Sequence, residues 1–340
     1  MITCIDSDLL RAASLLKNSE VVAIPTETVY GLAANGFDVN AVDKIFKVKE
    51  RPSFNPLILH FPCKKSAMQV VESCPPWAEQ LMNEFWPGPL TLVLPKKSNV
   101  PSIVTAGKST VAVRVPQHRV MLQLLQMLEF PLAAPSANLY GRTSPTKPEH
   151  VLQDLKGKIS YILDGGNCAC GIESTIIGVG ENQEPVLLRP GALDVQLLEN
   201  SIGKINSYTV KHTHPIAPGM MDQHYAPSTP AFLVEDVSDY LTAKAQLKLG
   251  ILSFESREKP DGVEIRVLSE KLDLNEAARN LYARIRELDG LDLDLILFEK
   301  APLEGIGVAL NDKLTRASKS ELELQKLLKN EPAITSRKPL

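Results

Sequence analysis

The chain has 340 residues, with a hydrophobic fraction of 44% and a charged fraction of 23%, values that are ordinary for a folded globular protein. This length exceeds what one small core needs and favours two domains. The net charge of −3, from 40 acidic and 37 basic side chains, argues against a protein that coats nucleic acid by bulk charge, although a local basic cleft is compatible with this average.

Signals for targeting, membrane insertion and metal binding are weak. Residues 1–20 carry acidic side chains near the start and lack a long apolar core, so they do not predict a signal peptide. The apolar stretch at 120–130 is interrupted by glutamine and glutamate, so no membrane span is expected. The odd count of five cysteines favours reduced thiols in the cytoplasm. Cys168 and Cys170 have no second cysteine pair to complete a tetrahedral set, so a metal or redox role is the less favoured interpretation.

The first two thirds of the chain alternate short apolar strands with amphipathic stretches. Apolar spacing predicts a helix at 118–130, and a further helix is expected at 40–50. The predicted strands are short and aliphatic, and they cover residues 21–25, 56–61, 90–95, 110–116, 131–135 and 161–164. Such strands mixed with amphipathic helices predict an α/β domain, which we assign to residues 1–200.

The alternation lapses over residues 201–229, which are rich in proline and lack a sustained period. Such a stretch is typical of a linker or a functional loop. We interpret His212 and His214 as part of this linker rather than as a metal pair. A smaller α/β domain is predicted over residues 230–340, where Asn311 is expected to cap the last helix. Its strands are predicted at 231–234, 249–254 and 293–299, and its helices at 238–248, 275–289 and 311–328.

Polar side chains in the first domain follow or close several of the predicted strands. The ends of strands are where α/β sheets bind ligands, because the strands fix the backbone while the loops reach inward. Lysine, arginine, hydroxyl and amide groups together suit a polyanion such as a nucleotide phosphate. Neither GxxxxGK(S/T) nor GxGxxG occurs, so such a site would use side chains from several loops. The candidates are Thr26, Glu27, Thr28, Lys47, Lys49, Arg51, His60, Arg114, Ser136, Asn138, Glu173, Ser174, Thr175 and Arg189.

Each candidate also has an ordinary structural interpretation. A helix C-terminus favours cations, which accounts for Lys49 and Arg51 without a ligand. Arg114 is compatible with an edge-strand side chain whose charge reaches solvent, and His60 with a structural histidine. Serine and asparagine are common in turns, so residues 136–138 alone do not indicate a site. The conjunction of these signals, rather than any one of them, favours a ligand site.

A set of long motifs carries a family resemblance. In chain order they are PTETVYGLAA, KVKERP followed by NPLILH, FWPGPLTLVL, VAVRVP, PLAAPSANLYGRTSPT, ILDGG followed by GIESTII, LLRPG and PGMMDQHYAP, and they fall within residues 20–228. With them the chain resembles the YrdC-like family and, within it, the threonylcarbamoyl-AMP synthases in their long two-domain form. The stretch GIGVALNDKLTRAS at 305–318 resembles the C-terminal domain of that form, so the resemblance covers nearly the whole chain.

The resemblance implies a fold and a reaction. The fold is a twisted mixed-sheet domain with a concave, positively charged cavity, followed by a smaller Rossmann-like α/β domain. In the reaction, L-threonine, bicarbonate or CO2, and ATP give threonylcarbamoyl-AMP and pyrophosphate, which makes the enzyme a nucleotidyltransferase. A downstream tRNA threonylcarbamoyl-transferase complex then passes the group to the adenosine next to the anticodon. Mg²⁺ is expected to arrive with ATP, and no side chain is assigned to it.

The resemblance also assigns roles to individual residues. The family's Lys-x-Arg falls on Lys49 and Arg51 and its Ser-x-Asn on Ser136 and Asn138, and these four are expected to hold the nucleotide phosphates during catalysis. The other residues expected to contact ATP are Thr110, Ser144, Arg189 and Tyr225, and those expected to bind threonine are Thr26, His60, Arg114 and Ser174.

The proline-rich linker at 201–229 is expected to act as a lid, because carbamates and acyl-adenylates are labile in water. One departure from the family pattern lies in this linker. Where the family commonly has basic or aromatic residues, the chain has Met221, Asp222 and Gln223. If a basic residue at this place normally contacts a phosphate, a lid with these residues binds the nucleotide less tightly, a question that the sequence leaves open. Arg142, in the loop after the strand at 131–135, is expected to face solvent.

Two alternative functions remain open from the sequence. One is an RNA-binding module, against which the acidic balance and the lack of aromatic-plus-basic runs count. Tight binding of tRNA is accordingly not expected. The other is a carbamoyl-transfer enzyme related to hydrogenase maturation, although this chain lacks the acylphosphatase and zinc-finger segments of that relative. The role of the second domain and the oligomeric state stay open.

Overall fold

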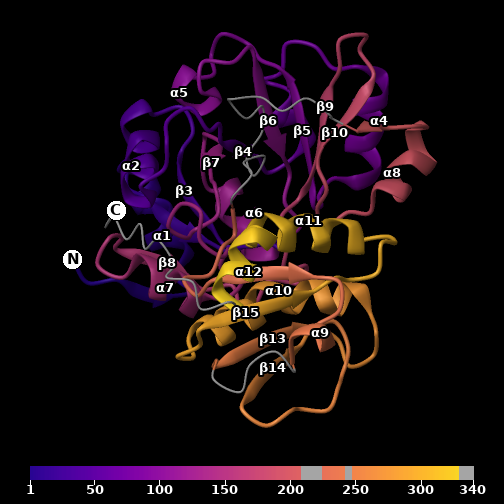
Figure 1. The fold of residues 1–340 in the computed structure, drawn as a ribbon. Helices are drawn as coiled ribbons and strands as arrows, with labels where there is room; N and C mark the ends of the chain where they lie inside the picture. The colour runs from indigo at the N-terminus through magenta and orange to yellow at the C-terminus, as the bar shows by residue number, and fades with distance from the viewer. Residues whose placement is uncertain (208–223, 242–246, 329–340) are drawn as a thin grey trace.

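The computed structural model describes residues 1–207, 224–241 and 247–328, and within these ranges it contains two β-sheets (Figure 1). The larger sheet belongs to the first domain, a name we use for residues 1–207. Its strands are β1 (Cys4–Asp6), β2 (Val22–Ile24), β3 (Gly31–Asn35), β4 (Ile58–His60), β5 (Leu90–Pro95), β6 (Thr110–Arg114), β7 (Leu132–Ala133), β8 (Tyr161–Leu163), β9 (Thr175–Val179), β10 (Pro185–Arg189) and β11 (Asn206–Ser207).

The larger sheet is mixed, as the sequence predicts. Its strand order is β1-β8-β2-β3-β7-β4-β6-β5-β9-β10-β11. Strands β4 and β6 pair in parallel, with His60 opposite Arg114, while β5 and β6 are antiparallel. Strands β5 and β9 are again parallel, and β9 and β10 are antiparallel. The ends of β4, β6 and β10 and the start of β9 therefore meet at one edge of the sheet.

Helices on both faces of this sheet fix where its loops begin. Helix α2 (Val39–Lys49) starts at Asp38, whose carboxylate accepts hydrogen bonds from the backbone N–H of Asn40 and Ala41. It ends at Glu50 in a left-handed conformation with φ of 56°, so the chain turns sharply between Lys49 and Arg51. The remaining helices of the first domain are α1 (Leu9–Lys17), α3 (Lys64–Ala67), α4 (Pro76–Phe85), α5 (Ser102–Thr105), α6 (Arg119–Gln126), α7 (Pro148–Leu155) and α8 (Val195–Ile202).

The second domain, residues 231–328 apart from 242–246, has a smaller sheet in which all pairs are parallel. Its strand order is β12-β15-β13-β14, with β12 (Ala231–Val234), β13 (Leu249–Ser253), β14 (Val263–Val267) and β15 (Leu295–Glu299). Its helices are α9 (Ser238–Leu241), α10 (Leu274–Asp289), α11 (Gly307–Ala317) and α12 (Glu321–Leu328). Parallel strands joined by helices confirm the predicted Rossmann-like arrangement.

Helix α10 joins the two domains. Its buried residues recur at helical spacing, from Ala277 through Leu281 and Ile285 to Leu288. They belong to one apolar cluster with Val29 and Ile172 of the first domain. Gly171 meets the same helix, because a Cβ atom there would lie 2.4 Å from the Cα of Arg279. Figure 1 shows α11 between the two sheets, so the second domain packs on the first through its helices.

The predicted helix at 311–328 is wrong, because the structure has two helices there. α11 ends at Ala317 and α12 begins at Glu321. Ser320 and Glu323 form a capping box, in which the serine hydroxyl and its backbone N–H both donate to the glutamate Oε2. Asn311 is not a cap either. It lies inside α11, and its side-chain amide forms two hydrogen bonds with the backbone of Ala301.

Most of the predicted linker lies outside the described residues. Of the lid predicted at 201–229, residues 208–223 lie outside, and with them His212, His214 and Met221–Gln223. Of the predicted helix at 238–248, residues 238–241 form α9, residues 247–248 are not helical, and residues 242–246 likewise fall outside. Within the described ranges, the structure has no helix with the length and apolarity of a membrane span.

Candidate active site

A cavity opens at the edge of the larger sheet where the ends of β4, β6 and β10 meet. Its walls come from loops next to β2, β4, β6, β7, β9 and β10, together with residues 224–225 that lead into the second domain. The residues predicted from the sequence that line it are Thr26, Arg51, His60, Arg114, Ser136, Ser174, Arg189 and Tyr225. Side chains separated by more than a hundred residues in the sequence therefore face one space.

Lys49 lies just behind the cavity wall and holds the loop after β7. Its side chain is buried, and its Nζ donates to the backbone carbonyls of Ser136 and Asn138. The Asn138 amide in turn donates to the carbonyls of Leu139 and Arg142, at 2.8 and 2.7 Å. Burial, and then the charge of Arg51, holds the pKa of Lys49 well below its usual range. The Lys-x-Arg and Ser-x-Asn motifs are thus in direct contact, with Lys49 shaping the loop.

Arg51 turns into the cavity from the sharp bend after α2. It is buried, and its Nη2 donates to the carbonyl of Pro56 at 3.0 Å. Burial lowers the pKa of Arg51 to about 10, so the guanidinium stays protonated at neutral pH. Among the described residues, no carboxylate lies within ion-pair distance of Arg51. Its charge is therefore available to an anion in the cavity.

The pKa values of His60 and His224 are lowered by burial and in part by positive charges around the cavity. Burial, followed by the charge of Arg114, lowers the pKa of His60 to about 3. Burial, followed by the charges of Arg51 and Lys49, also holds the pKa of His224 well below its usual range. Both imidazoles are therefore neutral at pH 7, and the cationic groups around them favour an anionic ligand.

Arg114 sits at the end of β6 in a different environment from Arg51. Its Nη2 lies 2.7 Å from the Glu27 carboxylate, and both side chains are buried. Its Nη1 donates to Thr28 Oγ1 at 3.0 Å, and its Nε donates to the carbonyl of Gly88 at 3.2 Å. This buried pair holds the guanidinium in one orientation at the cavity wall, as recognition of a carboxylate requires.

Hydroxyl groups complete the wall on two sides. The Thr26 hydroxyl donates to the carbonyl of Val29 at 2.6 Å and so closes the turn after β2. On the other side, the Ser174 hydroxyl lies 2.7 Å from that of Thr91 and accepts from Arg189 Nη2 at 3.2 Å. Arg189, at the end of β10, also donates to the Ser174 carbonyl. These bonds position the hydroxyls without filling the cavity.

Tyr225 and His224 close the cavity from the side of the second domain. Tyr225 is buried and has a φ of 67°, a left-handed conformation that non-glycine residues seldom adopt. Its ring lies against His224, with centroids 4.2 Å apart, and against Tyr282 of α10, with centroids 5.6 Å apart. Among the described residues the Tyr225 hydroxyl has no hydrogen-bond partner, although it is buried. Buried polar groups without a partner are uncommon in folded proteins, which makes this hydroxyl a candidate for a functional contact.

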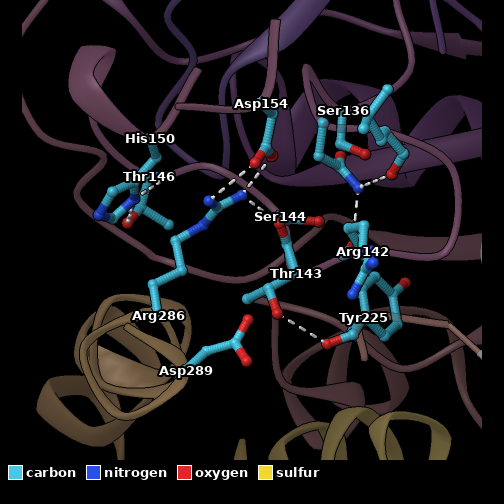
Figure 2. A network of polar contacts seen from close by, with 12 residues as sticks. Ser136, Arg142, Thr143, Ser144, Thr146, His150, Asp154, Tyr225, Arg286 and Asp289 are labelled. Atoms are coloured by element: carbon cyan, nitrogen blue, oxygen red, sulfur yellow. Dashed lines mark hydrogen bonds and ion pairs between the residues drawn. The ribbon is translucent and has the colours of Figure 1, made fainter. Parts of the chain in front are cut away.

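Four residues predicted for the site do not line the cavity. Asn138 and Lys49 shape its loop from behind. Ser144 donates to Glu173 Oε1 at 2.6 Å, so its hydroxyl is directed toward a carboxylate. Thr110 starts β6 and lies about 13 Å from Arg114 along the strand, given the usual rise per residue. Figure 2 shows Ser136, Ser144 and Tyr225 around the loop, with Arg142 beside them. Arg142 is exposed, as predicted, and donates to Ser228 Oγ at 2.7 Å.

Three polar residues that line the cavity had no individual role predicted from the sequence. Glu173 and His224 stand next to the predicted Ser174 and Tyr225, and Thr28 lies in the first motif. Glu173 and Thr28 were among the polar candidates at strand ends. For His224 the signal was its place in the HYAP motif, but only the fold shows that it lines the same cavity as Arg51.

The structure gives no support to a metal centre built from side chains. No group of three or more His, Cys, Asp or Glu residues has metal-binding geometry within the described ranges. The five cysteines are unpaired, and burial raises the pKa of the Cys170 thiol to about 11. Cys170 is therefore a protonated thiol at neutral pH, which is the state of an unreactive cysteine.

Comparison with known proteins covers both domains. A family described as "Telomere recombination", with the short name Sua5_yciO_yrdC, matches residues 14–191. A second family, described as "Threonylcarbamoyl-AMP synthase, C-terminal domain", matches residues 192–319.

Full-length relatives match as well. The threonylcarbamoyl-AMP synthase of Pyrococcus abyssi is 42% identical over 90% of this chain and 93% of its own length. The enzyme of the same name from Bacillus subtilis is 40% identical over 92% of this chain and 93% of its own length. The crystal structure of P. abyssi Sua5 complexed with L-threonine superposes with a TM-score of 0.85 at 40% identity and covers 93% of this chain and 97% of that one.

Proposed function

The chain belongs to the Sua5/YciO/YrdC family in its two-domain form, and on that premise we propose that it is a threonylcarbamoyl-AMP synthase. In this proposal the substrates are L-threonine, bicarbonate or CO2, and ATP, and the products are threonylcarbamoyl-AMP and pyrophosphate. The enzyme is a nucleotidyltransferase, because it transfers an adenylyl group from ATP to the carbamate of threonine.

One observation carries the proposal: among the arginines that line the cavity, Arg51 and Arg114 have different kinds of partner. Arg51 has only neutral partners among the described residues, which suits a polyanion such as a triphosphate. Arg114 is held by Glu27 and Thr28, which suits a single carboxylate in a fixed orientation. A site for threonine beside a site for ATP phosphates explains why both are needed.

The reaction requires the enzyme to align its substrates and to neutralise their negative charges. It does not require a covalent intermediate with the enzyme. The amine of threonine adds to CO2 and loses a proton, which gives a carbamate. A carbamate oxygen then forms a bond to the α-phosphorus of ATP, and the bond to pyrophosphate breaks, with its electron pair leaving on pyrophosphate. Two anions must approach each other in this step. Arg51 and Arg189 are placed to offset that repulsion and to stabilise the charge on the leaving group.

His60 is proposed to contact threonine as a neutral imidazole. Its pKa of about 3 rules out an imidazolium at neutral pH, so the ring offers one donor and one acceptor. Its Nδ1 lies 3.4 Å from the carbonyl of Leu132. A donor role for Nδ1 leaves Nε2 as the acceptor toward the cavity. Such an acceptor suits the hydroxyl or the amine of threonine, whereas a cation there would compete with Arg114.

Mg²⁺ is proposed to enter with ATP. Glu173 lines the cavity, but both of its carboxylate oxygens already accept hydrogen bonds, from Ser144 and Tyr282. The proposal therefore assigns the ion to the phosphate oxygens, where it adds to the neutralisation supplied by Arg51. His224 and Tyr225 are proposed to keep water from the labile carbamate and adenylate, since both are buried against the cavity.

In the cell, the product is proposed to pass to a tRNA threonylcarbamoyl-transferase complex in the cytoplasm. The adenylate is a short-lived acyl donor, so a consuming enzyme that works on the adenosine next to the anticodon is part of this proposal. The chain itself is not expected to bind tRNA tightly.

The test is release of pyrophosphate by the full-length protein with ATP, Mg²⁺ and bicarbonate. With isotopically labelled L-threonine, the proposal predicts pyrophosphate and a labelled adenylate in equal amounts. Without threonine, it predicts neither product. Release of pyrophosphate that does not depend on threonine, or a complete lack of labelled adenylate, contradicts the proposed function.

A further inference from the structure

Helix α10 presents two polar side chains to the loop that forms the cavity. Tyr282 and Arg286 are four residues apart, so they lie one above the other on the same face of the helix. Their contacts converge on two consecutive residues of the first domain, Thr143 and Ser144. Both residues follow the loop that Lys49 and Asn138 shape.

The first contact runs through Glu173. The Tyr282 hydroxyl donates to Glu173 Oε2 at 2.8 Å, and the Ser144 hydroxyl donates to Oε1 at 2.6 Å. All three side chains are buried, and Glu173 also lines the cavity. Burial, together with the charge of Glu173, raises the pKa of Tyr282 far above its usual range, so the phenol stays a donor. The carboxylate is thereby fixed between the two hydroxyls instead of turning toward the arginines of the cavity.

The second contact is direct. Arg286 Nη2 donates to the backbone carbonyl of Thr143 (Figure 2). The same guanidinium binds Asp154 of α7 through both of its Nη atoms, at 3.2 and 2.6 Å, and little of either side chain is exposed. The Thr143 hydroxyl donates to the carbonyl of Tyr225 at 3.0 Å. Arg286 thus ties together α7, the Thr143–Ser144 segment and the residue that closes the cavity.

We propose that Tyr282 and Arg286 are positioning residues of the active site, through which the second domain sets the ATP affinity of the first. This inference rests on the proposed function for its choice of ligand. Tyr282 acts by holding the Glu173 carboxylate away from Arg51 and Arg189, where a free carboxylate would compete with the triphosphate. Arg286 acts by fixing the backbone at Thr143. The second domain is then a part of the catalytic unit rather than an appended module.

Tyr282→Phe tests the first contact, because it removes one hydroxyl and keeps the ring that packs on Tyr225. We expect the Kd of MgATP, measured by titration calorimetry on the full-length protein, to rise about tenfold, as the loss of a hydrogen bond to a charged group predicts. The KM for ATP should rise with it, while kcat changes less. Tyr240→Phe is the matched control, since Tyr240 packs within the second domain and should leave both values unchanged.

A combined variant separates positioning from simple loss of packing. In Glu173→Gln, the carboxylate that competes for the arginines is absent. Adding Tyr282→Phe to this variant should therefore raise the Kd of MgATP by much less than it does in the wild type. Equal effects in both backgrounds, or an unchanged Kd in Tyr282→Phe, overturn the role of Tyr282.

Arg286→Lys and Arg286→Ala test the second contact. Lysine keeps the charge but cannot bind Asp154 and the Thr143 carbonyl through a planar fork, so partial rescue relative to alanine is expected. Wild-type affinity in Arg286→Ala overturns the role of Arg286. These titrations are independent of turnover. If the wild type binds MgATP but releases no pyrophosphate, the proposed reaction fails while the positioning role is still decided by the Kd values.

Discussion

Buried basic side chains have different partners in the two domains. In the first domain, Lys49 and Arg51 donate to backbone carbonyls, which are neutral. In the second domain, the buried Lys313 donates to Asp312 at 2.7 Å as well as to the carbonyl of Pro190, and the partly exposed Arg257 pairs with Glu299. A carbonyl satisfies the hydrogen-bonding needs of a base without cancelling its charge, whereas a carboxylate does both.

This difference distinguishes a binding site from a structural contact. Charge left uncancelled in a buried place is unfavourable for folding and is retained where a ligand later supplies the opposite charge. Arg114 is intermediate between a base bonded only to carbonyls and a base neutralised by a carboxylate. Glu27 partly offsets its charge and holds its guanidinium in a fixed orientation. The comparison predicts that removing a base that lines the cavity harms chemistry, and that removing a base paired only within the second domain, such as Arg257, harms only stability.

The largest effect is expected for Arg51→Gln. The change removes the charge that faces the phosphates, so kcat/KM for ATP should fall by roughly 10² to 10³, as for other donors aimed at a developing charge. Pyrophosphate release at saturating threonine measures it. Arg51→Lys keeps the charge and should retain more of the activity. Wild-type kcat/KM in Arg51→Gln would show that the charge is not used.

A smaller kinetic effect is expected for Arg114. Arg114→Gln should raise the KM for threonine by roughly 10- to 100-fold, the range for a lost hydrogen bond to a charged group, and should also lower the unfolding temperature by leaving Glu27 unpaired. In the double variant Arg114→Gln with Glu27→Gln, stability should recover while the KM for threonine stays high. Recovery of the KM together with stability would contradict binding of the threonine carboxylate by Arg114.

The buried histidines predict a pH dependence of stability. The pKa of His60 is about 3 in the folded protein against an ordinary value of 6.5, so the unfolded chain binds more protons between these values. The free energy of unfolding should therefore fall as the pH drops from 6.5 toward 3, and His60 should contribute no slope above that range. His60→Asn should make the fall shallower in chemical denaturation, and His118, His150 and His224, whose pKa values burial also lowers, should contribute to the slope that remains. An unchanged slope would contradict burial of a neutral His60.

The smallest effect is expected for Arg257→Gln in the second domain. The ion pair with Glu299 is partly exposed, with 21% and 16% of the two side chains accessible, so its loss should lower the free energy of unfolding by only about 1 kcal/mol. The KM and kcat should remain those of the wild type. A changed KM or kcat in Arg257→Gln would contradict the claim that this ion pair of the second domain serves stability alone.

Local patterns were enough to predict most elements of the fold. The run LTLVLP became β5, and the helical spacing after His118 became α6, with the His118 side chain as its cap. The predicted helix at 311–328 was wrong, because a capping box at Ser320 and Glu323 starts a new helix inside an unbroken helical pattern. Asn311 was predicted as a cap from its residue type. Residue type alone does not show that its side chain bonds to the backbone of Ala301 instead.

The candidate site could be predicted as a set of residues but not as a set of distances. Motifs placed Arg114 and Arg189 at strand ends and Arg51 just after a helix, and the fold then brought the three together at one cavity. The contacts between Tyr282 and Glu173, and between Arg286 and Thr143, join residues more than a hundred positions apart. They depend on how the second domain packs, which no local pattern encodes. The roles of Thr110 and Ser144 in binding ATP stay predictions.

The decisive experiment is a crystal structure of the full-length protein with L-threonine, Mg²⁺ and a non-hydrolysable ATP analogue. We expect the triphosphate against Arg51 and Arg189 and the threonine carboxylate against Arg114, with Glu173 still held between Ser144 and Tyr282. A nucleotide bound in the second domain, or a triphosphate that makes no contact with Arg51, would contradict this expectation.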